Sequence, residues 1–480
     1  MAGVVALSAG GALPAVAVAR TRPIVVPLVP LAGAAIAGLA VTAMTAVGAS
    51  FLTWYLALSV ICAATVGVVW ARWPRTRPWD DAAGSVGFRG AHLVAGLVGL
   101  GVCAIFLGSL KAPMTQFDAR GVWLLHPFWY LQGHERTVAV LRDRGYALAH
   151  PPYPPLIGGS VALTWLAAGT KSLRLGVVMI ALLGALSVLA AGTAIVETAT
   201  AVAREATDVA LRSRVVSISV ALAGGVMFVA FAAAGPLAQA GYADLVWASA
   251  AVGAVAYGLV LECTAPNVGV AAALATVAGL TKLEGSIVAA VIVGLVAVRW
   301  YRVLRGSGAT RPLARAVGFA AVPWVLIGAW PLALQLLGAA PDVPFQGPRE
   351  GSDATRFVDA ASGFVHWAGT NVGALGGALA VAILGAVYLR CARRAAGLGS
   401  DLWAWAVICV ELGVVCAAYV VGPGVASRWV QVSVARTTLF AALEAWWILT
   451  TWAVIAAGRL RYPHLAHAGA EKLDEPQWVR

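Results

Sequence analysis

The chain has 480 residues, of which 61% are hydrophobic and only 11% are charged. This excess of apolar residues excludes an ordinary soluble domain and predicts an integral membrane protein. The formal net charge of +12 would suggest nucleic-acid binding by a soluble protein. In a membrane protein the distribution of Lys and Arg indicates topology instead, so nucleic acid is not an expected partner.

A helix needs about 20 consecutive apolar residues to cross a bilayer. Stretches of this kind occur at 24–48, 52–71, 91–110, 173–198, 215–234, 245–263, 316–338, 371–390, 402–421 and 438–458. Residues 268–281 and 286–300 are shorter, but a polar break between them predicts two more helices that meet at one surface. We therefore expect an all-α polytopic membrane protein with about 12 transmembrane helices. A loose N-terminal arm, 1–23, would precede the single domain 24–458, and a tail, 459–480, would follow it.

Lys and Arg gather in alternate connections between these spans, for example in 72–89 and 299–315. The positive-inside rule places these connections, and with them both termini, on the cytoplasmic side of the plasma (inner) membrane. This alternation holds only if the apolar stretch 154–169 does not cross. We therefore expect a helix lying along the outer surface there, within a long outer loop, 111–172. The sequence has no metal-ligand spacing and no phosphate-binding loop, so neither a metal nor a cofactor is expected.

Polar residues are concentrated in the predicted outer segments. Asp118 lies in an amphipathic stretch, 111–133, that is expected to lie on the membrane and to break at Pro127. Its carboxylate can act as a base that Arg120 stabilises, or it can simply cap a helix. Asp244, at the outer mouth of a span, has the same two interpretations.

The stretch "GLTKLEG", 279–285, interrupts an apolar region with Lys282 and Glu284. A Lys at such a break either binds an anion or extends into the lipid headgroups, and Glu284 would orient it. Arg436, before the last span, has the same two uses. The proline-rich "HPPYPP" predicts a rigid bend, and we expect its residues His150 and Tyr153, with Trp123, to contact a sugar or an acceptor.

The segments "FDARGVW", "HPPYPPL", "GYADLVWA" and "GLTKLEG", in this order, resemble the glycosyltransferase C superfamily. The resemblance is to bacterial membrane enzymes similar to protein O-mannosyltransferases and lipid A aminoarabinose transferases. It implies a polyprenyl-phosphate sugar as donor and an acceptor hydroxyl on a polysaccharide, a lipid or a protein, on the outer face of the membrane. The transfer would be an inverting single displacement, for which one base suffices.

The resemblance also implies roles for individual residues. Asp118 would deprotonate the acceptor, Asp244 would be the second acidic residue, and Lys282 would lie near the donor phosphate. Arg436 and Arg120 could add positive charge beside that phosphate. The sequence departs from the family where Ala119 and Arg120 follow Asp118 and where Leu283, Glu284 and Gly285 replace the usual Gly-Pro.

Two other classes of function fit parts of the sequence. A transporter is suggested by Glu411, near the middle of a span, and by Glu444, because ionisable residues at that depth usually have a function. A non-catalytic subunit of an envelope-assembly machine would keep the helical architecture without needing Asp118. The three readings differ in whether Asp118, Asp244 and Lys282 lie together.

Overall fold

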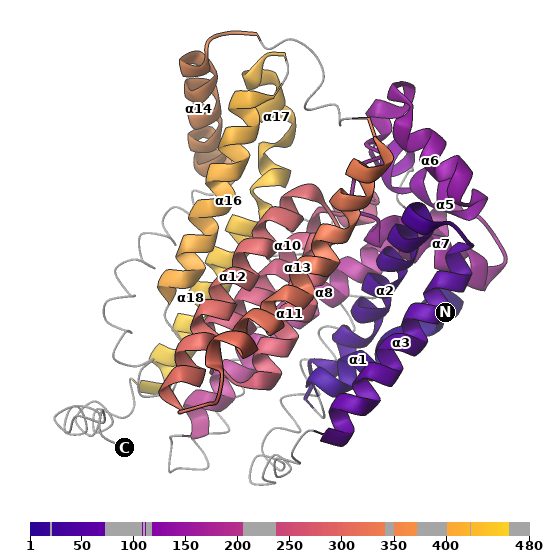
Figure 1. Ribbon diagram of the computed structural model, residues 1–480. Coiled ribbons are helices and arrows are strands. Elements are labelled where there is room, and N and C mark those ends of the chain that lie inside the picture. Colours follow the sequence, from indigo (N-terminus) through magenta and orange to yellow (C-terminus); the bar gives the residue numbers. More distant parts are fainter. Residues whose placement is uncertain are drawn as a thin grey trace.

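The computed structural model describes residues 1–19, 22–72, 108, 111, 118–204, 237–340, 350–371, 401–422 and 424–459. The regular elements in these ranges are helices, which confirms the all-α class (Figure 1). They are α1 (Ala2–Ala19), α2 (Val25–Val47), α3 (Phe51–Arg72), η2 (Ala119–Trp123), α5 (His126–Gln132), α6 (His134–Arg142), η3 (Arg144–Ala149), α7 (Leu156–Ala168), α8 (Leu173–Arg204), α10 (Asp244–Val255), η4 (Ala256–Val260), α11 (Ala265–Gly279), α12 (Leu283–Gly306), α13 (Pro312–Leu337), α14 (Asp353–Asn371), α16 (Asp401–Val421), α17 (Ala426–Thr437) and α18 (Leu439–Arg459).

Six helices in the described part of the chain are long and apolar enough to cross a membrane. They are Ala2–Ala19, Val25–Val47, Leu173–Thr198, Leu283–Gly306, Pro312–Leu337 and Leu402–Val421. The membrane class is thus supported, but the count of about 12 spans stays a prediction. The predicted span 215–234, and nearly all of 91–110 and of 371–390, lie outside the described residues.

The N-terminal residues, which we predicted to form a loose arm, form the regular helix α1. α1 packs against α2 where glycines face the neighbouring backbone. A Cβ atom at Gly11 would lie 1.9 Å from the carbonyl oxygen of Val29, and one at Gly33 would lie 1.9 Å from that of Leu7. Such glycines let helix backbones approach closely, as is common between membrane helices. The pairing is antiparallel, so Met1 lies toward the C-terminal part of α2.

The apolar stretch 154–169, which we expected on the surface, forms an interior helix. α7 packs against α1, α2, α5 and α8, and all residues from Leu156 to Trp165 are buried. A helix that is apolar on every side is stable only when it is surrounded. Its 13 residues extend for about 20 Å, less than the roughly 30 Å of a bilayer core, so its length fits a segment that does not cross.

The predicted amphipathic helix 111–133 is divided into two parts where it is described. The short π-helix η2 follows Asp118, and α5 begins beside Pro127. Proline is favoured in the first turn of a helix because that turn does not use its missing N–H. The proline therefore starts a new helix here.

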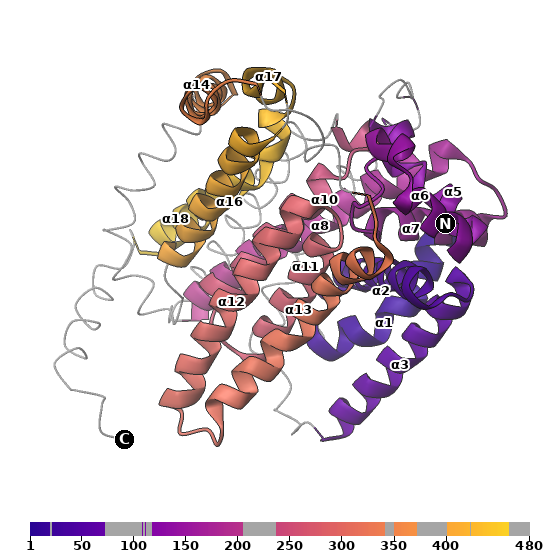
Figure 2. The same ribbon diagram turned by 45° about the horizontal axis from the view of Figure 1, so that its top comes forward.

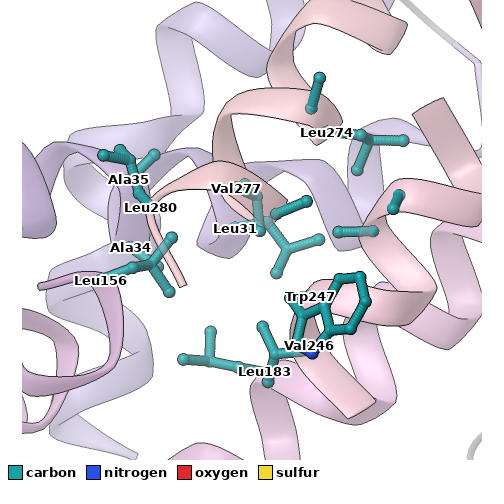
Figure 3. Close-up of a cluster of buried hydrophobic side chains, with 14 of the residues drawn as sticks. Leu31, Ala34, Ala35, Leu156, Leu183, Val246, Trp247, Leu274, Val277 and Leu280 are labelled. Carbon is teal, nitrogen blue, oxygen red and sulfur yellow. The ribbon is translucent and has the colours of Figure 1, made fainter. Parts of the chain in front are cut away.

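The core lies where α2, α7, α8, α10 and α11 meet. Leu31, Leu156, Leu183, Trp247 and Leu274 are buried there, one from each of these helices (Figure 3). The backbone N–H of Leu156 donates to the carbonyl oxygen of Leu280 at 2.9 Å, which ties the start of α7 to the end of α11. This core supports the turns that begin α10 and α12.

The two ends of the molecule differ in the helices that form them. α14 and α17 stand together at one end, with α6 at the same end across the bundle (Figures 1 and 2). The connection between α12 and α13 lies at the opposite end. Exposed arginines lie at this end: Arg302 and Arg305 in the last turns of α12, Arg311 in the connection and Arg315 in the first turn of α13.

Candidate functional site

Asp118 pairs with a residue that lies far away in the sequence. Its Oδ2 accepts a hydrogen bond from Nη1 of Arg436 at 2.6 Å, across 318 positions. Asp118 precedes η2, but its side chain makes no capping hydrogen bond, and Arg120 is exposed. The capping role therefore does not describe this carboxylate, and its hydrogen-bond partner is the distant Arg436.

Arg436 lies in the last turn of α17, where a cation interacts favourably with the helix dipole. Its guanidinium carbon lies 4.9 Å from the centre of the Tyr242 ring, a cation–π contact. Burial acts to lower the pKa of Arg436, but Asp244 and then Asp118 outweigh it and raise the pKa above its ordinary value. Burial and the charge of Asp118 also raise the pKa of Tyr242. Arg436 therefore stays charged and links the two acidic residues.

Lys282 is enclosed by two carboxylates. Its Nζ lies 2.9 Å from Oδ1 of Asp244 and 3.2 Å from Oε1 of Glu284. The Lys282 side chain is only 7% exposed and that of Asp244 only 1%. Burial acts to lower the pKa of Lys282, but Asp244 and Glu284 raise it above its ordinary value. The interpretation of Lys282 as a side chain extending into the headgroups is therefore wrong.

Helix starts hold the acidic partners in place. Ala243 occupies the N-cap position of α10, so Asp244 lies in the first turn and does not cap the helix. Glu284 lies in the first turn of α12. The positive end of a helix dipole favours a carboxylate in both positions. The break in "GLTKLEG" thus brings Lys282 against the start of α10.

These five side chains form what we call the charged cluster: Asp118, Asp244, Lys282, Glu284 and Arg436. It combines three carboxylates with two cations. Asp244, Glu284 and Arg436 lie in α10, α12 and α17, and Asp118 and Lys282 directly precede η2 and α12. The sequence predicted all five as site residues, and the structure brings them together through Arg436 and Asp244. Within the described residues, no group of three His, Cys, Asp or Glu side chains is arranged to hold a metal ion.

The aromatic residues that we predicted to contact a sugar or acceptor also meet. The His150 and Tyr153 rings stack with their centres 4.6 Å apart, and the Trp123 ring lies 5.4 Å from Tyr153. Tyr153 is close enough to Lys282 to affect its pKa. Nε1 of Trp330 donates to the carbonyl oxygen of Pro152 at 2.8 Å, which fixes the proline-rich bend against α13. The aromatic group therefore borders the charged cluster.

Sequence reasoning missed Tyr242, although it lies two residues before Asp244 in the quoted segment "GYADLVWA". Only its position beneath the guanidinium of Arg436 distinguishes it from an ordinary loop tyrosine. It also missed Tyr419, whose hydroxyl lies 2.9 Å from the hydroxyls of both Ser433 and Thr437. That contact holds the last turn of α17, which carries Arg436, against α16.

Glu411 and Glu444 lie in the neighbouring helices α16 and α18. Neither belongs to the charged cluster as defined above, but Glu411 is close enough to Glu284 to interact with it electrostatically. The side chains of Glu411 and Glu444 are both fully buried. Within the described part of the chain, neither carboxylate has a hydrogen-bond partner. Buried groups of this kind are uncommon and usually have a reason.

No family model, curated protein or solved structure matches this chain. The resemblance to glycosyltransferases therefore rests on the short motifs alone. The arrangement itself offers one carboxylate at the edge of the cluster, a cation beside it and an adjoining aromatic group. Chemically, it can hold an anion and accept a proton from a hydroxyl beside it.

Proposed function

We propose that the chain is a membrane glycosyltransferase that moves a sugar from a polyprenyl-phosphate donor to an acceptor hydroxyl. One observation carries the proposal: segments far apart in an apolar chain place Asp118, Arg436, Asp244 and Lys282 in one charged cluster. Charges are costly beside a bilayer, so a gathered set of them calls for a functional explanation. A lipid-linked anionic substrate supplies one, because its phosphate needs cations and its tail needs an apolar surrounding.

The reaction assigns separate roles to Asp118 and Arg436. The acceptor oxygen forms a bond to the anomeric carbon while its proton passes to Asp118. The bond from that carbon to the phosphate oxygen breaks, and the electron pair leaves with the polyprenyl phosphate. Arg436, 25% exposed, can stabilise the charge that develops on this leaving group.

The remaining residues of the cluster would hold Arg436 and the carboxylates in position and would not contact the reacting atoms. Lys282, which we expected at the donor phosphate, donates a hydrogen bond to Asp244 and forms an ion pair with Glu284. We assign it mainly to holding these two carboxylates, of which Asp244 attracts Arg436. Trp123, His150 and Tyr153 offer aromatic faces of the kind that pack against sugar rings.

The decisive experiment incubates the purified protein with a panel of labelled polyprenyl-phosphate sugars and candidate polysaccharide, lipid and protein acceptors. We expect transfer from at least one donor. Asp118→Asn keeps the size of the side chain but removes its basicity, so turnover should fall by about 10²-fold or more. Asp143→Asn is the matched control, because Asp143 is exposed, lies outside the charged cluster and accepts a hydrogen bond from the backbone N–H of Gly145. Equal turnover by Asp118→Asn and wild type would refute the assigned base.

A transporter remains the second candidate, because Glu411 and Glu444 are buried carboxylates without hydrogen-bond partners in the described part of the chain. Reconstituted vesicles distinguish the two functions. Solute or proton movement that Glu411→Gln abolishes and Asp118→Asn leaves intact would favour transport. Sugar transfer that Asp118→Asn abolishes would favour the enzyme. A protein that does neither would fit the non-catalytic subunit.

A further inference from the structure

Resting on the proposed function, we propose that Arg436 exchanges partners in each catalytic cycle. In the free protein it holds Asp118, and when the donor arrives it turns to the phosphate and releases the carboxylate. Donor binding would thereby create the free base, so the donor must bind before the acceptor can react.

The first support is the contrast between the two ion pairs of the charged cluster. Asp118 and Arg436 are partly exposed, whereas Asp244 and Lys282 are almost fully enclosed. Exchanging a partner is far less costly for a pair that water already reaches, because water can solvate each charge in transit. Of the two cations, Arg436 is therefore the one suited to exchange.

The second support is that neighbouring residues hold the helix that carries Arg436 in place but do not restrict its guanidinium to one anionic partner. The hydroxyl of Tyr419 holds Ser433 and Thr437 in the last turns of α17. The Tyr242 ring lies under the guanidinium, and a ring face attracts a cation without prescribing which anion lies beyond it. Tyr242 is thus a positioning residue over which Arg436 can turn. A phosphate also matches the fork of donors on a guanidinium at least as well as a carboxylate does.

The third support is that the pair occupies an oxygen of the carboxylate that must act as the base. Oδ2 of Asp118 accepts a hydrogen bond from Nη1 of Arg436 at 2.6 Å, so an acceptor hydroxyl has to compete with the guanidinium for that oxygen. Moving Arg436 to the phosphate frees Oδ2 for the proton of the acceptor and places positive charge where the leaving group needs it. No further reactant is required, because the proton of the acceptor passes to Asp118.

The exchange predicts an effect on binding that a simple catalytic base would not have. Asp118→Asn removes the competitor for Arg436, so a sugar-free polyprenyl phosphate should bind about threefold to fivefold more tightly than it binds wild type. Arg436→Gln should bind it at least about tenfold more weakly. The double variant with Asp118→Asn and Arg436→Gln should bind polyprenyl phosphate no more tightly than Arg436→Gln alone, because the effect of Asp118→Asn acts through Arg436. Asp143→Asn should bind like wild type.

Tyr242 and the order of binding provide independent measurements. Tyr242→Phe keeps the ring and should keep donor affinity, while Tyr242→Leu should raise the KM for the donor more than it lowers kcat. In the wild type, a deoxy analogue of the acceptor identified in the transfer panel should inhibit uncompetitively against the donor. These experiments need no Asp118 variant, so they stand even if Asp118→Asn folds poorly.

The outcomes separate the exchange from the proposed function. If the wild type transfers sugar but Asp118→Asn binds polyprenyl phosphate no more tightly, the exchange is wrong and the enzyme assignment survives. Competitive inhibition by the deoxy acceptor would also overturn the exchange alone. If the wild type neither binds polyprenyl phosphate nor transfers sugar, both proposals fail.

Discussion

Two ion pairs of the charged cluster differ in how far water reaches them. The Lys282 and Asp244 side chains are 7% and 1% exposed, whereas those of Arg436 and Asp118 are 25% and 35% exposed. A single charge left in a buried pair is costly, while an exposed pair is worth only about 0–1 kcal/mol. We therefore expect the first pair to act on stability and the second on function.

Lys282→Met should strongly destabilise the protein, because it leaves the carboxylate of Asp244 buried without its cation. Breaking a buried pair in this way costs about 3–5 kcal/mol. Asp244→Leu in the same chain removes the orphaned charge, so the double variant should recover much of the loss. Thermal unfolding in detergent measures this, with Asp118→Asn as the comparison that should cost about 1 kcal/mol or less.

The difference in stability between the wild type and Lys282→Met should depend on pH in a definite direction. The pKa of Lys282 in the folded protein is raised, so its contribution to stability is present below the unfolded value of about 10.4. That contribution is lost only as pH rises through the folded value. The stability gap between wild type and Lys282→Met should therefore stay constant from pH 7 to about pH 9. A Lys282→Met protein as stable as the wild type would contradict the buried pair.

At the scale of elements, one buried arginine connects α14 to the end of α16 and the start of α17. Arg356 is 1% exposed. It directs all its guanidinium N–H groups at backbone carbonyls, which belong to Glu350, Tyr419, Val420, Gly422 and Gly424. The carbonyls of Tyr419, Val420 and Gly422 lie at the end of α16, where the last carbonyls of a helix have no partner within the helix. Arg356 therefore helps to place α17 and, through it, Arg436.

Arg356→Lys should loosen this connection although it keeps the charge. A lysine has three donors in place of five and lacks the planar fork, so carbonyls at the end of α16 lose their partners. We expect faster hydrogen exchange in 353–371 and 426–437, with α10 and α11 unchanged. Arg428→Lys, at an exposed position of α17, is the matched control. Equal exchange in the two variants would show that Arg356 does not hold these helices.

At the scale of the whole molecule, α12 separates the charged cluster from a basic end. Lys282 precedes the helix and Arg305 lies near its end. The 24 residues of α12 extend for about 36 Å, enough to cross a bilayer core of roughly 30 Å. The exposed arginines beyond Arg305 favour the cytoplasm by the positive-inside rule, so we expect the charged cluster to face outward.

Cysteine labelling tests this orientation. In a background without the native cysteines, single cysteines at Glu135 and Ala354 should react with an impermeant thiol reagent added to whole cells. A cysteine at Arg305 should react only after the cells are opened. All three positions are exposed, so accessibility within the fold does not bias the comparison. Labelling of intact cells at Arg305 alone would reverse the orientation and remove the basis for an outward-facing site.

Much of the site could be predicted from sequence, because charges are rare in an apolar chain and each one interrupts a regular pattern. Asp118, Asp244, Lys282, Glu284 and Arg436 were all predicted in this way. Their pairing was not, because partners 318 positions apart leave no local signal. Tyr242 and Arg356 were missed for the same reason, since their roles depend on contacts with distant segments.

The sequence by itself determined the helical membrane class and the positions of the polar breaks. Both follow from local composition and from the length of apolar runs, which the thickness of a bilayer limits. Only the tertiary structure decided that α1 packs against α2, that α7 lies inside the bundle, that Lys282 is enclosed and that Asp118 is held by Arg436. Lipid is as apolar as a protein interior, so the sequence of an apolar helix does not show whether lipid or protein surrounds it. The sequence around a charged side chain likewise does not show which distant residue will pair with it, because the fold brings the two together.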